Sequence, residues 1–363
     1  MIILKTMGIF LIQPLLWLGI VFTAVIYSLR IKNERADFRI AIDKDWYEIR
    51  HFIKKGILYG LLLSLFSLVI GIFLPPSLIF EYELLASLAM VLLPVVDLSS
   101  LPLFIVGSSL IVKAPHLAVN GFLLLTCNYF IKTKLVADRE STWFTPQIKK
   151  GKRGRRIIEY HWHEFSILPL LIFIPGHEFN NLFGFLPVLK FGQLHFSIFI
   201  LPLFVGSVGR IFKEQPQIAL INYRKQNKIL SLGALFAAVL SYLLPQSAFI
   251  LWGILVVISW GMILWRKALD NNSKQWYVET NSGVRVIAIR PNTPAAKMNL
   301  KIGDIILNCN GRPVHNENQF YVALQQNSAY CHLKIKTFNG DLKITEGAIY
   351  NDSPYELGIV LFH

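Results

Sequence analysis

Long apolar runs constrain this chain more than any other feature of its sequence. The clearest cover about 8 to 29, 56 to 74 and 229 to 265, and 54% of all residues are hydrophobic. One soluble core cannot bury that much apolar surface, whereas a helix of about 20 apolar residues crosses a bilayer. The first run has only Lys5 ahead of it and no small-residue cleavage site, which indicates an uncleaved anchor. We therefore expect a polytopic α-helical membrane domain over residues 1–268.

The number of crossings is harder to predict than their existence. Residues 84–131 are divided into short apolar pieces, compatible with one or three crossings, by Pro94, Asp97, Pro102, Lys113 and Pro115. The stretch 165–212 is interrupted by the polar segment 176–181, which favours two crossings with a polar connection. The expected total is about seven or eight helices, and the side of the N-terminus depends on which number holds.

Basic connections predict the orientation. Segments 30–55, 132–164 and 210–228 hold eight, nine and five Lys or Arg, whereas 75–83 and 245–248 hold none. Because cytoplasmic connections are enriched in Lys and Arg, the three basic segments are expected in the cytoplasm. Arg266 and Lys267 end the last apolar run, so the linker 269–276 and everything after it are expected there too.

The formal net charge of +14 does not require a nucleic-acid partner. Of the 36 Lys and Arg, 27 precede residue 268, mostly in those connections. One dense run could also contact anionic lipid headgroups, with topology determination as the favoured explanation: Lys149, Lys150, Lys152, Arg153, Arg155 and Arg156. Cys127, Cys309 and Cys331 form no metal-binding spacing and no even disulfide framework, so reduced thiols are expected.

The last part of the chain, 277–363, has a different pattern. Val284, Val286 and Ile289 alternate as in a strand, and the cluster 291–294 then opens a short helix. Asn310-Gly311 is a hairpin signal, and Asn339-Gly340 joins strands expected at 331–337 and 342–348. Between these hairpins a helix is expected from an Asn316 N-cap to Gln326, with one apolar face formed by Phe320, Ala323 and Leu324. The pattern predicts a small α+β domain.

These elements resemble a PDZ domain of the bacterial protease-associated type. The resemblance covers 283–362 and rests on PNTPAA, LKIGDII, the NG turns and the LG pair, all at compatible spacing. It implies that an extended peptide or a free C-terminus adds as a strand beside a helix. A small α+β domain that only packs against its neighbours is the alternative.

Within that resemblance, the carboxylate-binding loop is best matched by 355–359. Gly358 suits a turn in which backbone N–H groups approach an anion. Glu356 departs from the pattern, so an internal segment instead of a free C-terminus stays open as the ligand. The expected peptide-binding residues are Tyr355, Leu357, Gly358, Ile359, Val360, Leu361, Phe320, Ala323 and Leu324. Spacing alone leaves open whether Phe320 and Leu324 face ligand or core.

No catalytic constellation is predicted, and neither a cofactor nor a metal is expected. A zinc protease helix needs two histidines one turn apart, but His177-Glu178 is followed by Asn181 and His163-Glu164 by Ile167. No GxSxG segment precedes the PDZ-like region. A role in transport would rest on Asp97, His116 and Asn120 near apolar runs, and a structural or interfacial role is favoured for them. We expect no enzyme.

The whole chain resembles the MinJ family of Gram-positive cell-division topology proteins. The similar segments are LIQPLLWLGI, the basic loop from Arg30, GILYGLLLSL and IPGHEFNNLFGFLPV, together with the PDZ-like end. This resemblance implies a multi-pass scaffold of the Min system at the septum and poles, with DivIVA-like and MinD-like proteins as partners. A PDZ-containing regulator of a membrane protease or secretion complex, presenting clients through the same groove, is the alternative. An intramembrane metalloprotease is the least favoured one.

Overall fold

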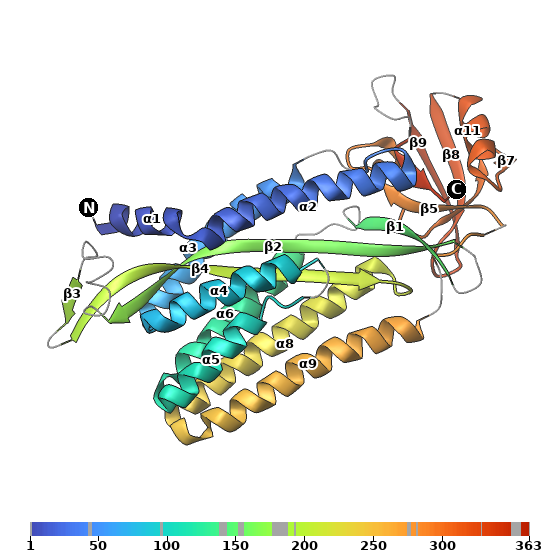
Figure 1. Cartoon of the computed structure of the whole chain (residues 1–363). Helices are drawn as coiled ribbons and strands as arrows, with labels where there is room; N and C mark the ends of the chain where they lie inside the picture. Colours follow the sequence, from blue (N-terminus) through green and yellow to red (C-terminus); the bar gives the residue numbers. More distant parts are fainter. Residues whose placement is uncertain are drawn as a thin grey trace.

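The computed structural model describes most of the chain. The described residues are 2–42, 46–94, 97–137, 144–151, 156–175, 188–191, 194–273, 277–280, 282–327, 329–349 and 357–362. Figure 1 shows an elongated molecule in which a long strand pair runs between two groups of helices, with a small β-rich domain at one end.

The first 272 residues are largely helical, as the apolar runs predict. The helices are α1 (Ile2–Ile12), α2 (Pro14–Phe38), α3 (Tyr47–Ile70), α4 (Pro76–Leu92), α5 (Leu101–Lys113), the short η1 (Pro115–Leu117), α6 (Ala118–Ala137), α8 (Pro216–Leu243), η3 (Pro245–Ser247) and α9 (Ala248–Asn272). Within the described residues, four are long and apolar enough to cross a membrane: Pro14–Phe38, Glu48–Ile70, Pro216–Leu243 and Pro245–Asn272. The expected membrane domain is confirmed, but the expected count of seven or eight crossings is not reproduced.

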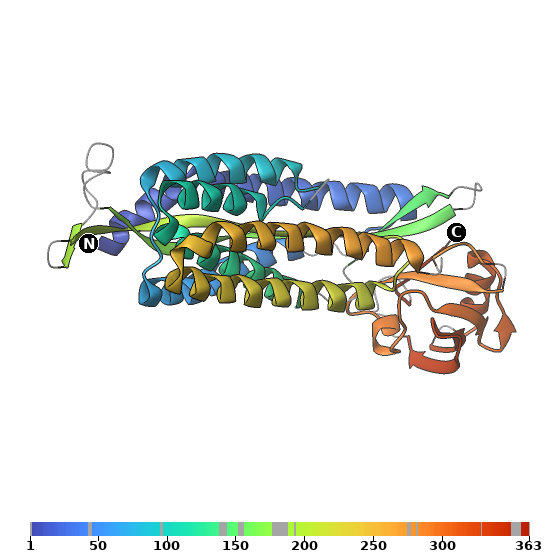
Figure 2. The same cartoon turned by 90° about the horizontal axis from the view of Figure 1, so that it is seen from below.

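Prolines set two of the helix boundaries in this half of the chain. The first apolar run breaks at Gln13, and Pro14 begins α2 as a separate helix. The last run breaks at Pro245, which separates α8 from α9, and Figure 2 shows these two helices lying side by side. Proline lacks the N–H that a helix interior needs, so it is tolerated only near a helix start.

The largest correction concerns the stretch 165–212, whose described residues form strands for most of their length and not the two expected membrane helices. β2 (Arg156–Pro175) and β4 (Leu194–Ile211) pair antiparallel from Tyr160 opposite Ile211 to Pro175 opposite Phe196. β1 (Thr145–Lys150) and β3 (Val188–Phe191) extend the sheet at opposite ends, in the order β1-β2-β4-β3. Apolar runs rich in β-branched and aromatic residues suit a buried strand as well as a helix, and periodicity does not distinguish the two.

Side chains of the surrounding segments cover both outer edges of this hairpin. The Ser64 hydroxyl in α3 donates to Pro169 O at 2.9 Å and accepts from Leu171 N–H at 3.0 Å. On the β4 side, Phe204 N–H donates to the Tyr82 hydroxyl at 2.8 Å, and Gly206 O accepts from the Ser99 hydroxyl at 2.8 Å. The strand edges therefore find hydrogen-bond partners where no further strand lies within the described part of the chain.

The C-terminal domain confirms the predicted α+β pattern. Its elements are β5 (Val284–Ile289), α10 (Pro294–Lys297), β6 (Ile305–Cys309), β7 (Arg312–Pro313), α11 (Glu317–Gln325), β8 (Tyr330–Lys336), β9 (Leu342–Ala348) and β10 (Ile359–Leu361). The Asn316 side chain caps α11 by accepting from Gln319 N–H at 2.8 Å, as predicted. The main sheet has the order β10-β5-β6-β8-β9.

A substitution in α3 tests how the hairpin edge is stabilised. Ser64→Ala removes the partner of Pro169 O and of Leu171 N–H, so we expect the free energy of unfolding to fall by about 1–3 kcal/mol. Ser67→Ala on the next turn is the matched control, because the buried Ser67 hydroxyl has no hydrogen-bond partner among the described residues. Thermal unfolding of the purified protein in detergent measures both; equal melting temperatures would contradict the assigned role of Ser64.

Candidate peptide-binding site

The predicted peptide-binding strand lies at the edge of the C-terminal sheet. β10 pairs antiparallel with β5, with Ile359 opposite Ile289 and Val360 opposite Ala288. Gly358 O accepts from Arg290 N–H at 2.9 Å, and Phe362 N–H donates to Arg285 O at 3.1 Å. Because neighbouring residues of a strand direct their backbone groups to opposite sides, those of Ile359 and Leu361 point away from β5. In the described sheet this side of β10 faces no further strand, and a strand edge of this kind is where a peptide adds in β-strand addition.

The turn before β10 is fixed by its glycine. Gly358 has φ +78°, and a Cβ placed on it would overlap the side chain of Thr293. Leu357 O accepts from Ala295 N–H at 3.0 Å, which holds the turn against the start of α10. Glycine meets both requirements, since it adopts positive φ without strain and leaves room for Thr293. Tyr355 and Glu356, the rest of the predicted loop, lie outside the described residues.

The structure brings the predicted side chains together in one cluster. Leu357, Ile359 and Leu361 are buried in the core of the domain with three residues of α11: Phe320, Ala323 and Leu324. The exposed fractions of these α11 side chains are between 1% and 4%, so all three pack in the core. A side-chain pocket for a ligand would lie at the boundary of this core, between β10 and α11.

Val360, also a predicted peptide-binding residue, points the other way. Together with Phe362 it belongs to a second buried set, here called the interdomain cluster, which joins the two domains. Its members are Phe38, Ile42, Val136, Phe144, Ile158, Tyr160, Trp162, Ile211, Ala219, Leu220, Tyr223, Tyr277, Ile287, Ala288, Ile302, Val360 and Phe362. Nothing in the local sequence pattern marks this contact, because its members come from distant parts of the chain.

Polar contacts surround the interdomain cluster. The Tyr160 hydroxyl donates to Ile287 O at 2.9 Å, and Ile158 N–H donates to Tyr277 O at 3.0 Å. Arg290 Nε donates to Ile42 O at 3.2 Å. The β-rich domain is therefore packed against the membrane domain and is not connected to it by the chain alone.

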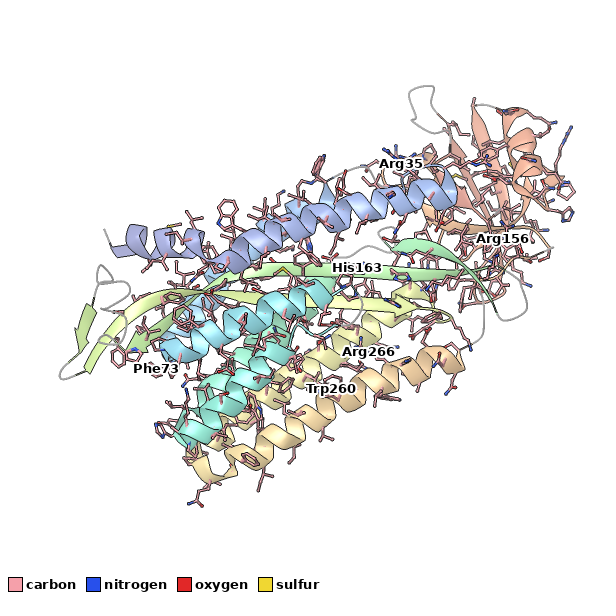
Figure 3. All side chains as sticks on the ribbon, viewed as in Figure 1. Arg35, Phe73, Arg156, His163, Trp260 and Arg266 are labelled. Carbon is pink, nitrogen blue, oxygen red and sulfur yellow. The ribbon has the colours of Figure 1, made fainter. Side chains whose placement is uncertain are left out.

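The basic run 149–156 is divided between two roles in the described structure. Lys149 forms an ion pair with the buried carboxylate of Glu159. Arg156, labelled in Figure 3, donates through Nε to Glu279 at 3.1 Å and lies over the Phe362 ring at 5.7 Å, so it contributes to the interdomain contact. Lys150 is exposed. The remaining predicted lipid contacts, Lys152, Arg153 and Arg155, lie outside the described residues.

Comparison with known proteins agrees with this arrangement. A family description reading "PDZ domain" matches residues 269–337. The chain is 30% identical over 381 residues to the cell division topological determinant MinJ of Bacillus subtilis, with 99% of this chain and 94% of that protein covered. A probable MinJ of Lacticaseibacillus paracasei is 26% identical over 366 residues, covering 95% of this chain and 94% of that protein.

The chain belongs to the MinJ family. The predicted resemblance is therefore confirmed, and so is the PDZ domain. A further match, to the serine protease HTRA1 of Xenopus tropicalis, is 32% identical but covers 69 residues, which is 19% of this chain and 15% of that protease. A match of that extent says nothing of the protease's activity here.

The residues considered for catalysis have structural partners in this MinJ family member. Glu164 lies in β2, not on a helix, and its Oε2 is 2.7 Å from Nδ1 of His51. Among the described residues, no group of three His, Cys, Asp or Glu is arranged to hold a metal ion. The other histidine–glutamate pair, His177 and Glu178, lies outside them. All three cysteines are buried and free.

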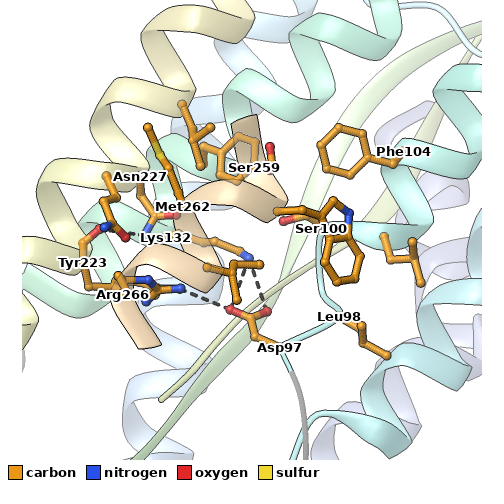
Figure 4. Close-up of a pocket in the computed structure, with 16 residues that line it drawn as sticks. Asp97, Leu98, Ser100, Phe104, Lys132, Tyr223, Asn227, Ser259, Met262 and Arg266 are labelled. Atoms are coloured by element: carbon orange, nitrogen blue, oxygen red, sulfur yellow. Dashed lines mark hydrogen bonds and ion pairs between the residues drawn. The ribbon is translucent and has the colours of Figure 1, made fainter. Parts of the chain in front are cut away.

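Asp97 and Asn120, two of the polar residues considered for transport, help to hold the fold together. The Asp97 carboxylate accepts from Lys132 Nζ at 3.3 Å and from the Tyr223 hydroxyl at 3.2 Å, which joins the segment before α5 to α6 and α8. Asp97, Lys132 and Tyr223 line a small pocket of about 50 Å³ together with Arg266 of α9, as Figure 4 shows. Asn120 accepts from Phe73 N–H at 3.0 Å, and His116 is exposed in η1. Sequence alone predicts no partner for Asp97, because Lys132 and Tyr223 are distant in the chain.

A pair of glycine substitutions tests the turn before β10. Gly340→Ala meets no atom within 4 Å and should cost only the strain of its positive φ, about 1–2 kcal/mol. Gly358→Ala should destabilise the domain more, because Thr293 must also move. Melting temperatures, together with hydrogen-exchange rates of the β5 and β10 amides in the folded protein, measure the difference in stability between the two variants. An equal loss in the two variants would contradict the close contact with Thr293.

Proposed function

We propose that this protein is a non-catalytic, membrane-anchored adaptor that positions division-site regulators through its PDZ domain. Membership of the MinJ family carries the proposal, and the side of β10 that faces away from β5 supplies the surface for it. The partners we propose are DivIVA-like and MinD-like division proteins, bridged at the septum and poles of a Gram-positive cell.

The proposed division of the chain follows from the same features. Residues 1–268 anchor the protein, 269–276 connect the domains, and 277–363 read peptides on the cytoplasmic side. Two observations support this placement. Arg35 and Arg156, labelled in Figure 3, lie toward the end of the molecule that carries the PDZ domain. In addition, α9 continues past Arg266 and Lys267 to Asn272 before the domain begins.

The bilayer would compensate for modest affinity at the peptide site. A PDZ groove buries a short segment, so a single site binds weakly, but partners on the same membrane surface reach a high effective concentration. Under this proposal the protein determines where its partners are located in the cell and catalyses no reaction.

A proline substitution tests the groove without removing the domain. Leu361→Pro removes the N–H that points away from β5, so strand addition should fail, whereas proline on an edge strand is compatible with the fold. Leu361→Ala loses the same side chain but keeps the N–H, and is the matched control. We expect the proline variant to lose two-hybrid interaction with the host's DivIVA-like or MinD-like proteins by about tenfold or more relative to the alanine variant. Equal interaction of both variants would exclude β10 as the binding edge.

Imaging separates the proposed role from the alternative one. A fluorescent fusion in a Gram-positive host lacking its own MinJ should concentrate at septa and poles, and the Leu361→Pro variant should stay in the membrane but spread evenly. A uniform envelope pattern for the unsubstituted protein would contradict division-site positioning and favour a subunit of a membrane protease or secretion complex.

A further inference from the structure

An open cavity of about 1030 Å³ adjoins the far end of the proposed peptide groove. One wall belongs to the PDZ domain and contains Phe362 and the N-terminal end of α11 at Asn316. The opposite wall belongs to the membrane domain and contains Ala36 and Arg39 at the end of α2. Figure 1 shows the C-terminal end of α2 reaching the PDZ domain.

The position of the cavity relative to β10 decides which part of a peptide would reach it. A peptide whose terminal carboxylate lies at Leu357-Gly358 runs antiparallel to β10, so its earlier residues pass Phe362. At about 3.3 Å per residue, roughly four residues cover the length of β10 and its turn. The preceding residues then enter the space between Phe362, Asn316 and the end of α2.

Charge indicates what kind of segment fits. Arg156 is paired with Glu279, and Asp37 accepts from Ile148 N–H at 3.2 Å. Glu317, the third carboxylate of the lining, also has an interaction partner, so these charges are all engaged. Arg39 is exposed, and its described hydrogen bond is the backbone N–H to Arg35 O at the end of α2. Burial lowers the pKa of Arg285, another lining residue, to about 10, which leaves it cationic at neutral pH. A guanidinium available at the membrane-domain wall favours carboxylates in the approaching segment.

We propose that the membrane domain completes the peptide site. Its occupant is the acidic part of a bound peptide about five to eight residues before the C-terminus, held between the end of α2 and the start of α11. This inference rests on the proposed function, because it assumes that a peptide adds to β10. It extends that function by assigning selectivity to Arg39, a residue outside the PDZ domain.

The test uses the full-length protein in nanodiscs of phosphatidylcholine, a zwitterionic lipid. The probes are fluorescent peptides that share one C-terminal tetrapeptide, taken as the tightest binder from a randomised tetrapeptide set. Extensions of Glu-Ser-Glu-Ser, Gly-Ser-Gly-Ser or Lys-Ser-Lys-Ser are added before it. Fluorescence anisotropy gives each Kd, and we expect the acidic extension to bind at least fivefold tighter than the Gly-Ser extension.

Three variants test which wall of the cavity produces the preference for the acidic extension. Arg39→Glu should reverse the preference between the acidic and the basic extension. Ala36→Trp, which fills the cavity from an exposed helix position, should abolish the gain from any extension. Arg35→Glu makes the same change in net charge on α2 but does not line the cavity, so it should leave the preference unchanged. The unextended tetrapeptide should bind all three variants equally.

Failure of this inference is distinguishable from failure of the proposed function. One outcome is that the tetrapeptide binds, that Leu361→Pro abolishes this binding, and that the three extensions bind equally well. The composite site is then wrong, whereas the proposed groove is retained. If Arg35→Glu reverses the preference as well as Arg39→Glu, general electrostatics and not the cavity wall explains it, and the composite site is again wrong. If no tetrapeptide binds, or Leu361→Pro has no effect, the groove and the composite site both fall.

Discussion

The structure depends on satisfying the backbone of a β-hairpin that lies among membrane-spanning helices. Unpaired N–H and C=O groups are costly in hydrocarbon, so strands cross a membrane only in closed barrels or where protein covers their edges. Here β2 and β4 satisfy each other on one side, and helices supply partners on the other. Phe173 exchanges hydrogen bonds with the turn after α3, donating to Ile72 O at 2.8 Å and accepting from Leu74 N–H at 3.1 Å. Gln13 Nε2 and Asn128 Nδ2 donate to carbonyls of β4. The polar side chains of the helices thus act as a substitute for neighbouring strands.

Two features of the sequence fit this arrangement. Pro169 and Pro202 lie directly opposite each other in the hairpin, and Pro169 O points outward to Ser64. Proline has no N–H, so at an outward-facing position it leaves no donor without a partner. In a central strand the same residue would remove a hydrogen bond between strands. Close approach of α3 depends on small residues: a Cβ on Gly60 would overlap the Pro169 ring, and one on Gly56 would lie 2.9 Å from Ile167 O. Gly56, Gly60 and Ser64 recur every four residues on one face of α3.

This explains why the sequence predicted one half of the molecule better than the other. The PDZ domain was predictable because turns specify it locally: Asn310, Gly311 and Gly340 all have positive φ where the NG pairs were expected. In the membrane half, the run 165–175 carries no period that separates strand from helix, and its pairing depends on a segment about thirty residues away. The buried partners of Asp97 and the interdomain cluster were not predicted for the same reason. They are properties of contacts between distant segments, which composition and periodicity do not encode.

The hairpin also determines how the PDZ domain is held against the membrane domain. Arg156, Ile158 and Tyr160 at the start of β2 contact the PDZ domain, and the same strand continues to Pro175 among the helices. A strand paired along its length bends less than a flexible linker, so β2 helps to fix the orientation of β10 relative to the membrane domain. Val360 and Phe362 of the proposed peptide-binding strand strengthen this coupling because they pack into the interdomain cluster. A peptide that added to β10, as proposed, would therefore meet a surface whose direction is fixed by the membrane domain.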